Sequence, residues 1–241
     1  EYEGDPGVAA MELYSYAHQL AADRGIDPQD DIMTKLVNAE IDGDRLTELE
    51  IDVFMLLLSV AGNETTRNAT AHGMHAFLTN PDQFSLLKSN VDKYIDTAVD
   101  EVIRWASPVL HFRRTTTQPV ELLGQEIEEG SRVVMWYISA NRDEEVFSNP
   151  YNFDITRSPN DHIAFGAGGA HYCLGANLAR AELRLIFQEI ATRMPDMKME
   201  GEPQRLRSNF IGGIKHLPVS WTPGPRVDPP PYKRETKLTD F

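Results

Sequence analysis

The glycine-rich stretch from Phe165 to Gly175 holds the only cysteine of the 241-residue chain, Cys173. Directly after it, apolar residues between 176 and 193 recur at three- and four-residue steps, which predicts an α-helix. A thiolate at the start of a helix is stabilised by unpaired backbone N–H groups and by the positive end of the helix dipole. Because glycines lack Cβ atoms, the main chain beside the sulfur can approach a flat ligand closely. These features suit an anionic sulfur ligand to a haem iron.

Three other interpretations of this stretch compete with an iron ligand. A lone cysteine often fills a buried apolar site. Gly166-Ala-Gly168 begins a G-x-G-x-x-G nucleotide loop, but His171 stands where the third glycine belongs, and no Gly-Lys-Ser/Thr follows. A nucleophile pair of Cys173 and His171 leaves the glycines and Phe165 without a role.

The stretch resembles the haem-binding loop of the cytochrome P-450 superfamily, the haem-thiolate monooxygenases. In that loop a Phe precedes Gly, a basic residue, Cys and Gly, and these positions are filled here by Phe165, Gly168, His171, Cys173 and Gly175. The resemblance implies that Cys173 is the axial ligand of the iron and that His171 pairs with a haem propionate. The distance from Phe165 to Cys173 is one residue longer than in the commonest version of the motif. The same lengthening occurs in an actinobacterial branch that oxidises sterols and methyl-branched lipids.

The longest predicted helix covers 47–79. Thr47-Glu-Leu-Glu50 forms a capping box at its start, and Asn80-Pro81 ends it. The first half is apolar nearly all round, which predicts a central buried helix.

The middle of this helix contains Ala61-Gly-Asn-Glu64-Thr65-Thr66, in which glycine and two threonines are weak helix formers. Taken alone, this is a tolerated weak spot in a helix as readily as a functional feature. The segment resembles the oxygen-binding helix of haem-thiolate monooxygenases. That resemblance implies a widened turn beside the iron, with Ala61 next to haem, Thr65 hydrogen-bonded to the oxygen ligand and Glu64 relaying protons. His72 and His75 lie further along and are expected to be packed or surface histidines, because no carboxylate stands at a matching step for a metal site.

Glu101 and Arg104, three residues apart, share a face of another predicted helix. Because the same spacing recurs elsewhere in the chain, the pair has weight only through the segments that follow it. Those segments resemble a strand with a propionate-binding arginine, here Arg114, and a later segment that supplies a second arginine, here Arg157. The resemblance implies that Glu101, Arg104 and Arg157 form a buried charge cluster that fixes the cysteine loop.

The substrate pocket is also placed by resemblance. The implied lining residues are Val60, Ala61, Val109, Leu110 and Phe210, all apolar or nearly so, which suits a hydrophobic substrate. Segments 63–68, 176–180 and 209–216 are similar to actinobacterial sterol and branched-lipid ω-hydroxylases of the cholest-4-en-3-one 26-monooxygenase type. The implied reaction is terminal hydroxylation of a steroid side chain or a methyl-branched lipid.

The resemblance further implies haem b as cofactor and electrons that come ultimately from NAD(P)H. They must pass through a separate ferredoxin and ferredoxin reductase, because this chain shows no flavin or iron–sulfur motif. A monomer is implied for the full-length protein. Two other classes stay open: a haem-thiolate protein that binds or senses small molecules without turnover, and an inactive fragment that lacks half of the pocket.

Composition narrows the remaining function classes. Hydrophobic residues make up 41% and charged residues 25% of the chain, as in ordinary soluble proteins. A formal net charge of −14 argues against a nucleic-acid partner, and a single cysteine excludes an internal disulfide. The longest apolar run, Val53 to Gly62, is too short to span a bilayer, and no signal peptide is seen. A cytoplasmic protein of a bacterium, by resemblance an actinobacterium, is expected.

The predicted fold class is mainly α with small β-sheets, and by resemblance it is the C-terminal part of the cytochrome P-450 fold. Residues 1–221 are expected to form the C-terminal part of one haem-thiolate domain whose N-terminal helices are missing, and 222–241 a proline-rich disordered tail. Helices are predicted at 8–24, 30–40, 47–79, 81–89, 95–105 and 176–193. Short strands are predicted at 120–122, 125–127, 132–138, 197–199 and 217–221.

Overall fold

The computed structural model describes residues 5–225 and confirms a mainly α fold with small antiparallel sheets. Most of the predicted tail, from 226 onward, lies outside the described residues. The chain divides into two compact units, Glu1–Glu64 and Thr65–Phe241. Within residues 5–225, no helix combines the length and the apolar character that crossing a membrane requires.

The first unit has a small core of its own, formed by Ala17, Met33 and Ile51. Aspartates cap two of its helices, because the side chains of Asp5 and Asp31 accept hydrogen bonds from Gly7 N and Thr34 N. The second helix is shorter than the predicted 30–40, and its place is partly taken by a two-stranded hairpin. The elements are α1 (Pro6–Ile26), α2 (Ile32–Val37), β1 (Glu40–Ile41), β2 (Asp44–Arg45) and the first half of α3 (Glu48–Thr79).

Helix α3 is continuous over 32 residues and begins with the predicted capping box. Thr47 N donates to Glu50 Oε2 (2.8 Å), and Glu50 N donates to Thr47 Oγ1 (3.3 Å). The predicted widened turn at 61–66 is wrong, because the backbone there is ordinary α-helix. Threonine does not force the backbone open: Thr70 donates to the carbonyl of Thr66 (2.9 Å) within the intact helix.

The prediction that the first half of α3 is buried is also wrong. Val53 and Leu57 are 47% and 59% exposed, whereas Ala69, Met74 and Phe77 in the second half are buried. Within the described chain, the first half packs through one side only, against the small core of the first unit. The buried centre of the molecule therefore begins with the second unit.

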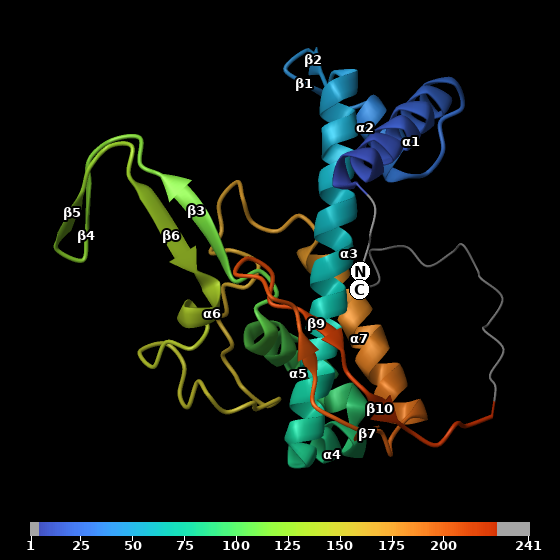
Figure 1. Ribbon diagram of the computed structural model, residues 1–241, viewed down its shortest axis with the longest axis vertical. Coiled ribbons are helices and arrows are strands. Elements are labelled where there is room, and N and C mark those ends of the chain that lie inside the picture. Colours follow the sequence, from blue (N-terminus) through green and yellow to red (C-terminus); the bar gives the residue numbers. More distant parts are fainter. Residues whose placement is uncertain (1–4, 226–241) are drawn as a thin grey trace. The chain divides into compact units, whose positions relative to one another are not determined.

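The second unit is built on a helical core. Helices α4 (Pro81–Ser89), α5 (Val91–Ala106) and α7 (Ala176–Arg193) pack with the second half of α3, and Figure 1 shows α3, α5 and α7 side by side. Phe77 of α3 lies at the centre, with its ring 5.2–5.5 Å from the rings of Phe84, Phe153 and Phe187. Gly73 permits this close packing, because an added Cβ would lie 2.6 Å from the ring of Phe187.

Small antiparallel pairs of strands complete the second unit. Strand β3 (His111–Thr115) pairs with β6 (Arg132–Trp136), and the hairpin of β4 (Val120–Leu122) and β5 (Gln125–Ile127) lies between them in sequence. The predicted strand 132–138 ends at 136, because Tyr137 starts the short helix α6 (Tyr137–Ala140). The remaining pairs are β7 (Lys198–Met199) with β10 (Val219–Ser220), and β8 (Gln204–Arg205) with β9 (Ile214–His216).

Candidate functional site

A fully buried carboxylate, that of Glu101 in α5, is surrounded by hydrogen-bond donors. Arg104, also fully buried, donates from Nε to Oε2 and from Nη2 to Oε1, both at 2.7 Å. Arg157 Nε donates to Oε2 at 3.1 Å, as does the Asn160 side chain, and the backbone N–H of Asp154 donates to Oε1 at 2.9 Å. This geometry satisfies the carboxylate on both oxygens, as a buried charge requires.

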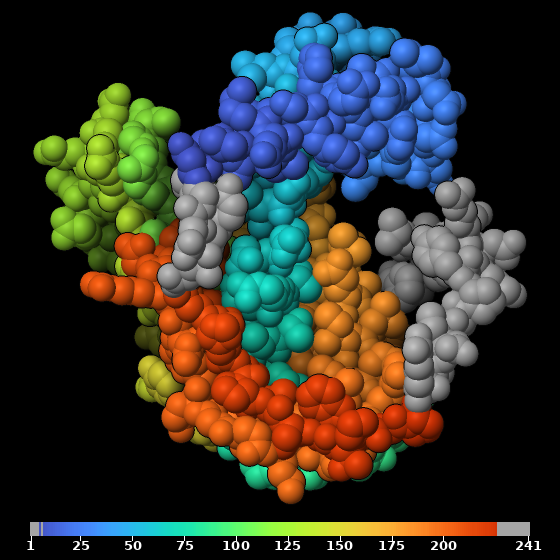
Figure 2. Space-filling view, turned by 45° about the vertical axis from the view of Figure 1, so that its right-hand side comes forward, coloured from blue at the N-terminus to red at the C-terminus, as the bar shows by residue number. Residues whose placement is uncertain are grey.

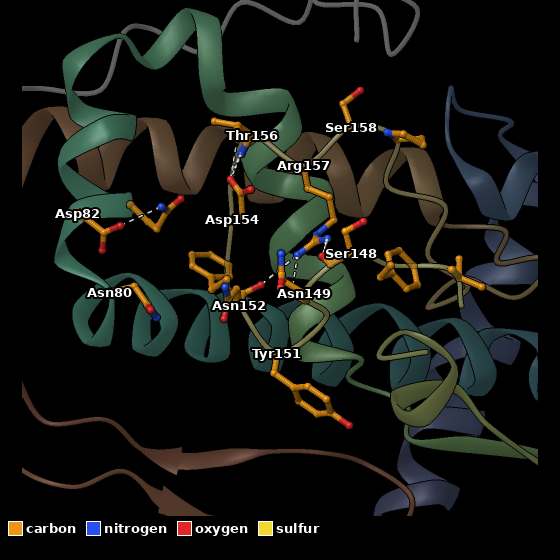
Figure 3. Close-up of a pocket in the computed structure, with 15 residues that line it drawn as sticks. Asn80, Asp82, Ser148, Asn149, Tyr151, Asn152, Asp154, Thr156, Arg157 and Ser158 are labelled. Atoms are coloured by element: carbon orange, nitrogen blue, oxygen red, sulfur yellow. Dashed lines mark hydrogen bonds between the residues drawn. The ribbon is translucent and has the colours of Figure 1, made fainter. Parts of the chain in front are cut away.

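The two arginines use their remaining N–H groups on main-chain carbonyls. Arg157 donates to the carbonyls of Ser148 (2.8 Å), Asn149 (3.3 Å) and Asn152 (3.1 Å), as Figure 3 shows. The irregular segment 147–159 is thereby wrapped around the two guanidinium groups. A polar cavity of about 650 Å³ lies over this segment. Of the predicted site residues, only Arg157 lines it.

Asn141 connects this cluster to the cysteine loop. It is fully buried, and its carbonyl accepts from Arg104 Nη1 (2.7 Å). Its side-chain Oδ1 accepts from Ile163 N (2.8 Å), and its Nδ2 donates to Ser107 Oγ (2.9 Å). Sequence reasoning missed Asn141, because a buried asparagine after a short helix carries no pattern that separates it from a surface one.

The cysteine loop is closed by its own backbone. Cys173 N donates to Phe165 O (2.9 Å), and Gly166 N donates to Ile163 O (2.8 Å). Gly166, Gly168 and Gly169 have φ values of +92°, +104° and +78°, a region that residues with side chains rarely adopt. The loop delivers Cys173 two residues before Gly175, the N-cap of α7.

Asp100, next to Glu101 in α5, makes a second connection to the loop that the sequence did not reveal. Its Oδ1 accepts from Arg180 Nε of α7 (2.9 Å) and lies 3.5 Å from Nε2 of His162. Burial raises the pKa of Asp100, but these contacts outweigh burial, so that its pKa is lowered. The guanidinium of Arg180 lies 4.8 Å from the ring centroid of Phe165, the first residue of the loop.

The remaining predicted site residues fall into three places. Arg114 of β3 and His171 of the loop are exposed. Val60, Ala61 and Glu64 lie in the first unit, and Thr65 begins the second. Val109, Leu110 and Phe210 lie together, because Leu110 N donates to Phe210 O (2.9 Å) and Val109 forms a β-bridge with Ile211.

His72 of α3 is a packed histidine. Its Nε2 lies 3.1 Å from Gly212 O. Burial, with a contribution from the positive charge of Arg205, lowers the pKa of His72 to about 4. Among residues 5–225, no group of three or more His, Cys, Asp or Glu side chains is placed to hold a metal ion.

Similarity of this sequence to known proteins identifies its family. The family model described as Cytochrome P-450 matches residues 15–194. The chain belongs to the cytochrome P-450 family. Membership implies haem iron as the cofactor.

Among curated relatives, the chain is 53% identical over 218 residues to a steroid C26-monooxygenase of Mycolicibacterium smegmatis, with 90% of this chain and 50% of the relative covered. It is 50% identical over 228 residues to a methyl-branched lipid omega-hydroxylase of Mycobacterium tuberculosis, covering 91% and 53%. The chain therefore spans about half the length of the curated relatives it matches.

Solved structures bear out the predicted cytochrome P-450 fold. A Mycobacterium marinum cytochrome P-450 in complex with pseudoionone is 47% identical and superimposes with a TM-score of 0.84, covering 88% of this chain and 51% of that one. A Bacillus megaterium cytochrome P-450 in complex with testosterone has 37% identity and a TM-score of 0.83, covering 88% and 59%.

The donor set of the cysteine loop fits haem in a cytochrome P-450. Cys173 is exposed, and the amides of Leu174 and Gly175 beside it have no acceptor within residues 5–225. A single thiolate with nearby N–H donors suits an iron whose other ligands come from a macrocycle. Nothing within 4 Å would meet an added Cβ at Gly168 or Gly169, and Leu174 is 80% exposed, so this side of the loop offers open, partly apolar surface.

The buried cluster predicts a large stability loss for Glu101→Gln. Removing the carboxylate charge leaves two guanidinium groups without their counter-ion, and breaking such a buried cluster typically costs about 3–5 kcal/mol. Urea unfolding of the full-length haem-loaded protein measures the loss. The matched control is Glu189→Gln, whose partner Arg193 is exposed, and there we expect a loss of about 0–1 kcal/mol. Equal losses for the two variants would contradict the cluster's importance.

His72 predicts a pH dependence of stability. Because its pKa is lowered to about 4 in the folded chain, the unfolded state binds the proton more readily between about pH 6.5 and pH 4. Stability from His72 is therefore present above about pH 6.5 and is lost as pH falls to 4, with a total of about 3 kcal/mol. Between pH 7 and pH 4, the unfolding free energy of wild type should fall by this amount relative to that of His72→Gln. A constant difference across that range would contradict the prediction.

Proposed function

We propose that the protein carrying this chain is a haem-dependent monooxygenase that hydroxylates the terminal carbon of a steroid side chain or a methyl-branched lipid. The observation that carries the proposal is the exposed Cys173 thiol at the head of α7, in a loop anchored to a buried charge cluster. When bound, haem iron supplies the activation of dioxygen and the insertion of one oxygen atom into an unactivated C–H bond. The other oxygen atom leaves as water, at the expense of two electrons and two protons.

Cys173 is proposed as the axial thiolate. The free amides of Leu174 and Gly175 and the positive end of α7 stabilise the negative charge on its sulfur. Those donors also limit how strongly the sulfur pushes electron density towards a bound iron. Phe165, Gly168 and Gly175 are proposed to shape the loop surface that faces the macrocycle.

Arg114 and His171 are proposed to hold the propionates. Both side chains are exposed, and the guanidinium of Arg114 donates to the neighbouring carbonyl of Arg113 (3.0 Å). Guanidinium and imidazolium groups form short, charge-assisted hydrogen bonds to carboxylates. Ala61 of α3 is proposed as a further haem contact.

Thr65 and Glu64 are proposed to handle protons. They are consecutive in α3, and the pair combines a hydroxyl that can both donate and accept with a carboxylate that can take up and release protons. In this proposal the Thr65 hydroxyl would hold a proton for the reduction of dioxygen, and Glu64 would replace that proton from solvent. A haem-thiolate protein that only binds small molecules would not need this pair.

The substrate is proposed from the pocket wall and the relatives. Val109, Leu110 and Phe210 lie on paired backbone segments, and Val60 and Ala61 are proposed as pocket residues by resemblance to the family. Such a lining suits a hydrophobic molecule. The relatives named above act on steroids and on methyl-branched lipids, according to their names. Electrons are proposed to come from NAD(P)H through a ferredoxin and its reductase, and the protein is proposed to act in the cytoplasm.

The axial ligand is tested with the full-length haem-loaded protein. The ferrous–CO absorbance of the wild type should be of the thiolate type. Cys173→Ala should lose that absorbance, because the substitution removes the proposed sulfur ligand. An unchanged spectrum would contradict the proposed ligand.

Thr65→Ala tests turnover. We expect the variant to consume NAD(P)H at a near wild-type rate with cholest-4-en-3-one, while product per NAD(P)H falls about tenfold, a loss of about 1.4 kcal/mol in the productive step. The matched control is Thr70→Ala, also in α3, whose hydroxyl bonds the carbonyl of Thr66. If Thr65→Ala kept wild-type product per NAD(P)H, Thr65 would have no part in the mechanism.

A further inference from the structure

Two segments far apart in sequence form one paired backbone in the second unit. Residues 108–110, which follow α5, lie alongside residues 210–212, the loop between β8 and β9. Leu110 N donates to Phe210 O and Gly212 N donates to Pro108 O, both at 2.9 Å. The two segments that carry the proposed pocket residues are therefore joined to each other by backbone hydrogen bonds.

Aromatic contacts support one end of these paired segments. The ring of Phe210 lies 5.6 Å from Phe112 in an edge-to-face arrangement and 5.8 Å from His111. Ser208 Oγ accepts from the backbone N–H groups of Phe210 and Ile211, both at 3.1 Å. Phe210 is still 42% exposed. Its ring therefore packs against Phe112 and His111 and leaves the remaining surface open to solvent.

Two side chains of α3 hold the base of the same loop. Asn68 is fully buried, and its Oδ1 accepts from Ile214 N at 3.3 Å. His72, one turn later, lies with Nε2 3.1 Å from Gly212 O. Figure 2 shows the orange-red segment that contains this loop lying against the teal second half of α3.

Two glycines of this loop, Gly212 and Gly213, are closely surrounded. A Cβ on Gly213 would lie 3.2 Å from Asn68 Oδ1 and 3.0 Å from Leu206 Cβ. A Cβ on Gly212 would lie 3.0 Å from Leu110 Cδ2. A side chain at either position would therefore force its neighbours to shift by a few tenths of an ångström.

We call Asn68 and His72 the clamp, because both side chains bond backbone atoms at the loop between β8 and β9. The clamp residues lie on the same face of α3 as Thr65. Thr65, Asn68 and His72 stand at i, i+3 and i+7 in α3, and such positions share one face of a helix. The helix face that presents the Thr65 hydroxyl thus also fixes the loop that carries Phe210.

We propose that Asn68 and His72 are positioning residues that set the register between the reacting centre and the pocket wall, and hence which carbon of the substrate is oxidised. This proposal rests on the proposed function. The clamp fixes Phe210 relative to Thr65 through two hydrogen bonds to backbone atoms of one loop. A loop released from α3 would let a long, flexible substrate slide along the pocket, so that carbons other than the terminal one are oxidised.

The test uses three variants of the full-length haem-loaded protein. His72→Phe keeps a ring of similar size but loses the N–H donor, His72→Gln keeps a donor, and His75→Phe is the matched control. The ring of His75, three residues further along α3, has no recorded hydrogen bond within residues 5–225. The probes are cholest-4-en-3-one and phytanic acid, which represent the two substrate classes.

For His72→Phe we expect amide hydrogen exchange in 206–214 to quicken about tenfold, in keeping with the loss of one hydrogen bond. The dissociation constant read from the substrate-induced spin-state shift should rise by a similar factor, and products hydroxylated at inner carbons should accumulate. His72→Gln should restore all three measurements towards wild type, and His75→Phe should leave them unchanged.

The clamp is overturned if His72→Phe leaves exchange in 206–214 at the wild-type rate. It is overturned equally if exchange quickens while the product distribution stays that of wild type, or if His75→Phe matches His72→Phe. The exchange measurement needs no turnover. It therefore judges the clamp even if the wild-type protein oxidises neither probe, an outcome that would count against the proposed substrates instead.

Discussion

The buried carboxylate of Glu101 organises the second unit of this protein. A charge removed from water is tolerable only when its oxygens are fully hydrogen-bonded, and here two arginines, an asparagine and a backbone amide provide those bonds. The donors come from α5 and from the irregular segment 154–160. Segments with little regular structure are thus held by one charge, which explains how a long stretch without helices or strands can lead into the cysteine loop in a fixed position.

The same cluster reaches the pocket wall through Ser107. This residue is fully buried, ends α5 in the left-handed region with a φ of 37°, and accepts from Asn141, whose carbonyl also binds Arg104. The chain then turns directly into residues 108–112, which pair with the loop that carries Phe210. One side of Asn141 therefore holds the approach to Cys173, and the other holds the start of the pocket wall. The proposed iron ligand and the proposed pocket wall thus share one buried support.

Much of the helical framework and the candidate residues could be predicted from the sequence, because their signals are local. The three- and four-residue apolar steps of α7, the capping box of α3 and the Asn-Pro at its end all act within a few residues. The family resemblance was likewise carried by short motifs, and the family model and the relatives confirmed it. The strands β8 and β9 were not predicted, because strands of two and three residues are too short to show an alternating pattern.

The features that were predicted wrongly or missed depend on tertiary packing, and the spacing of residues along the sequence does not reveal tertiary packing. Apolar residues on all sides of the first half of α3 predicted burial, yet Val53 and Leu57 are exposed because only one side of that half packs within the described chain. The resemblance at 61–66 implied a widened turn, yet the backbone there is ordinary α-helix. Asn68, Asn141 and His72 look like ordinary polar residues in the sequence. Their importance comes from carbonyl and amide groups between about 20 and 150 positions away in the chain.

X-ray absorption at the iron edge of the full-length haem-loaded protein tests the central claim most directly. The account predicts one sulfur scatterer at a thiolate bonding distance from the iron in the wild type, and its replacement by nitrogen or oxygen in Cys173→Ala. A wild-type spectrum that contains only nitrogen and oxygen scatterers around the iron would contradict it.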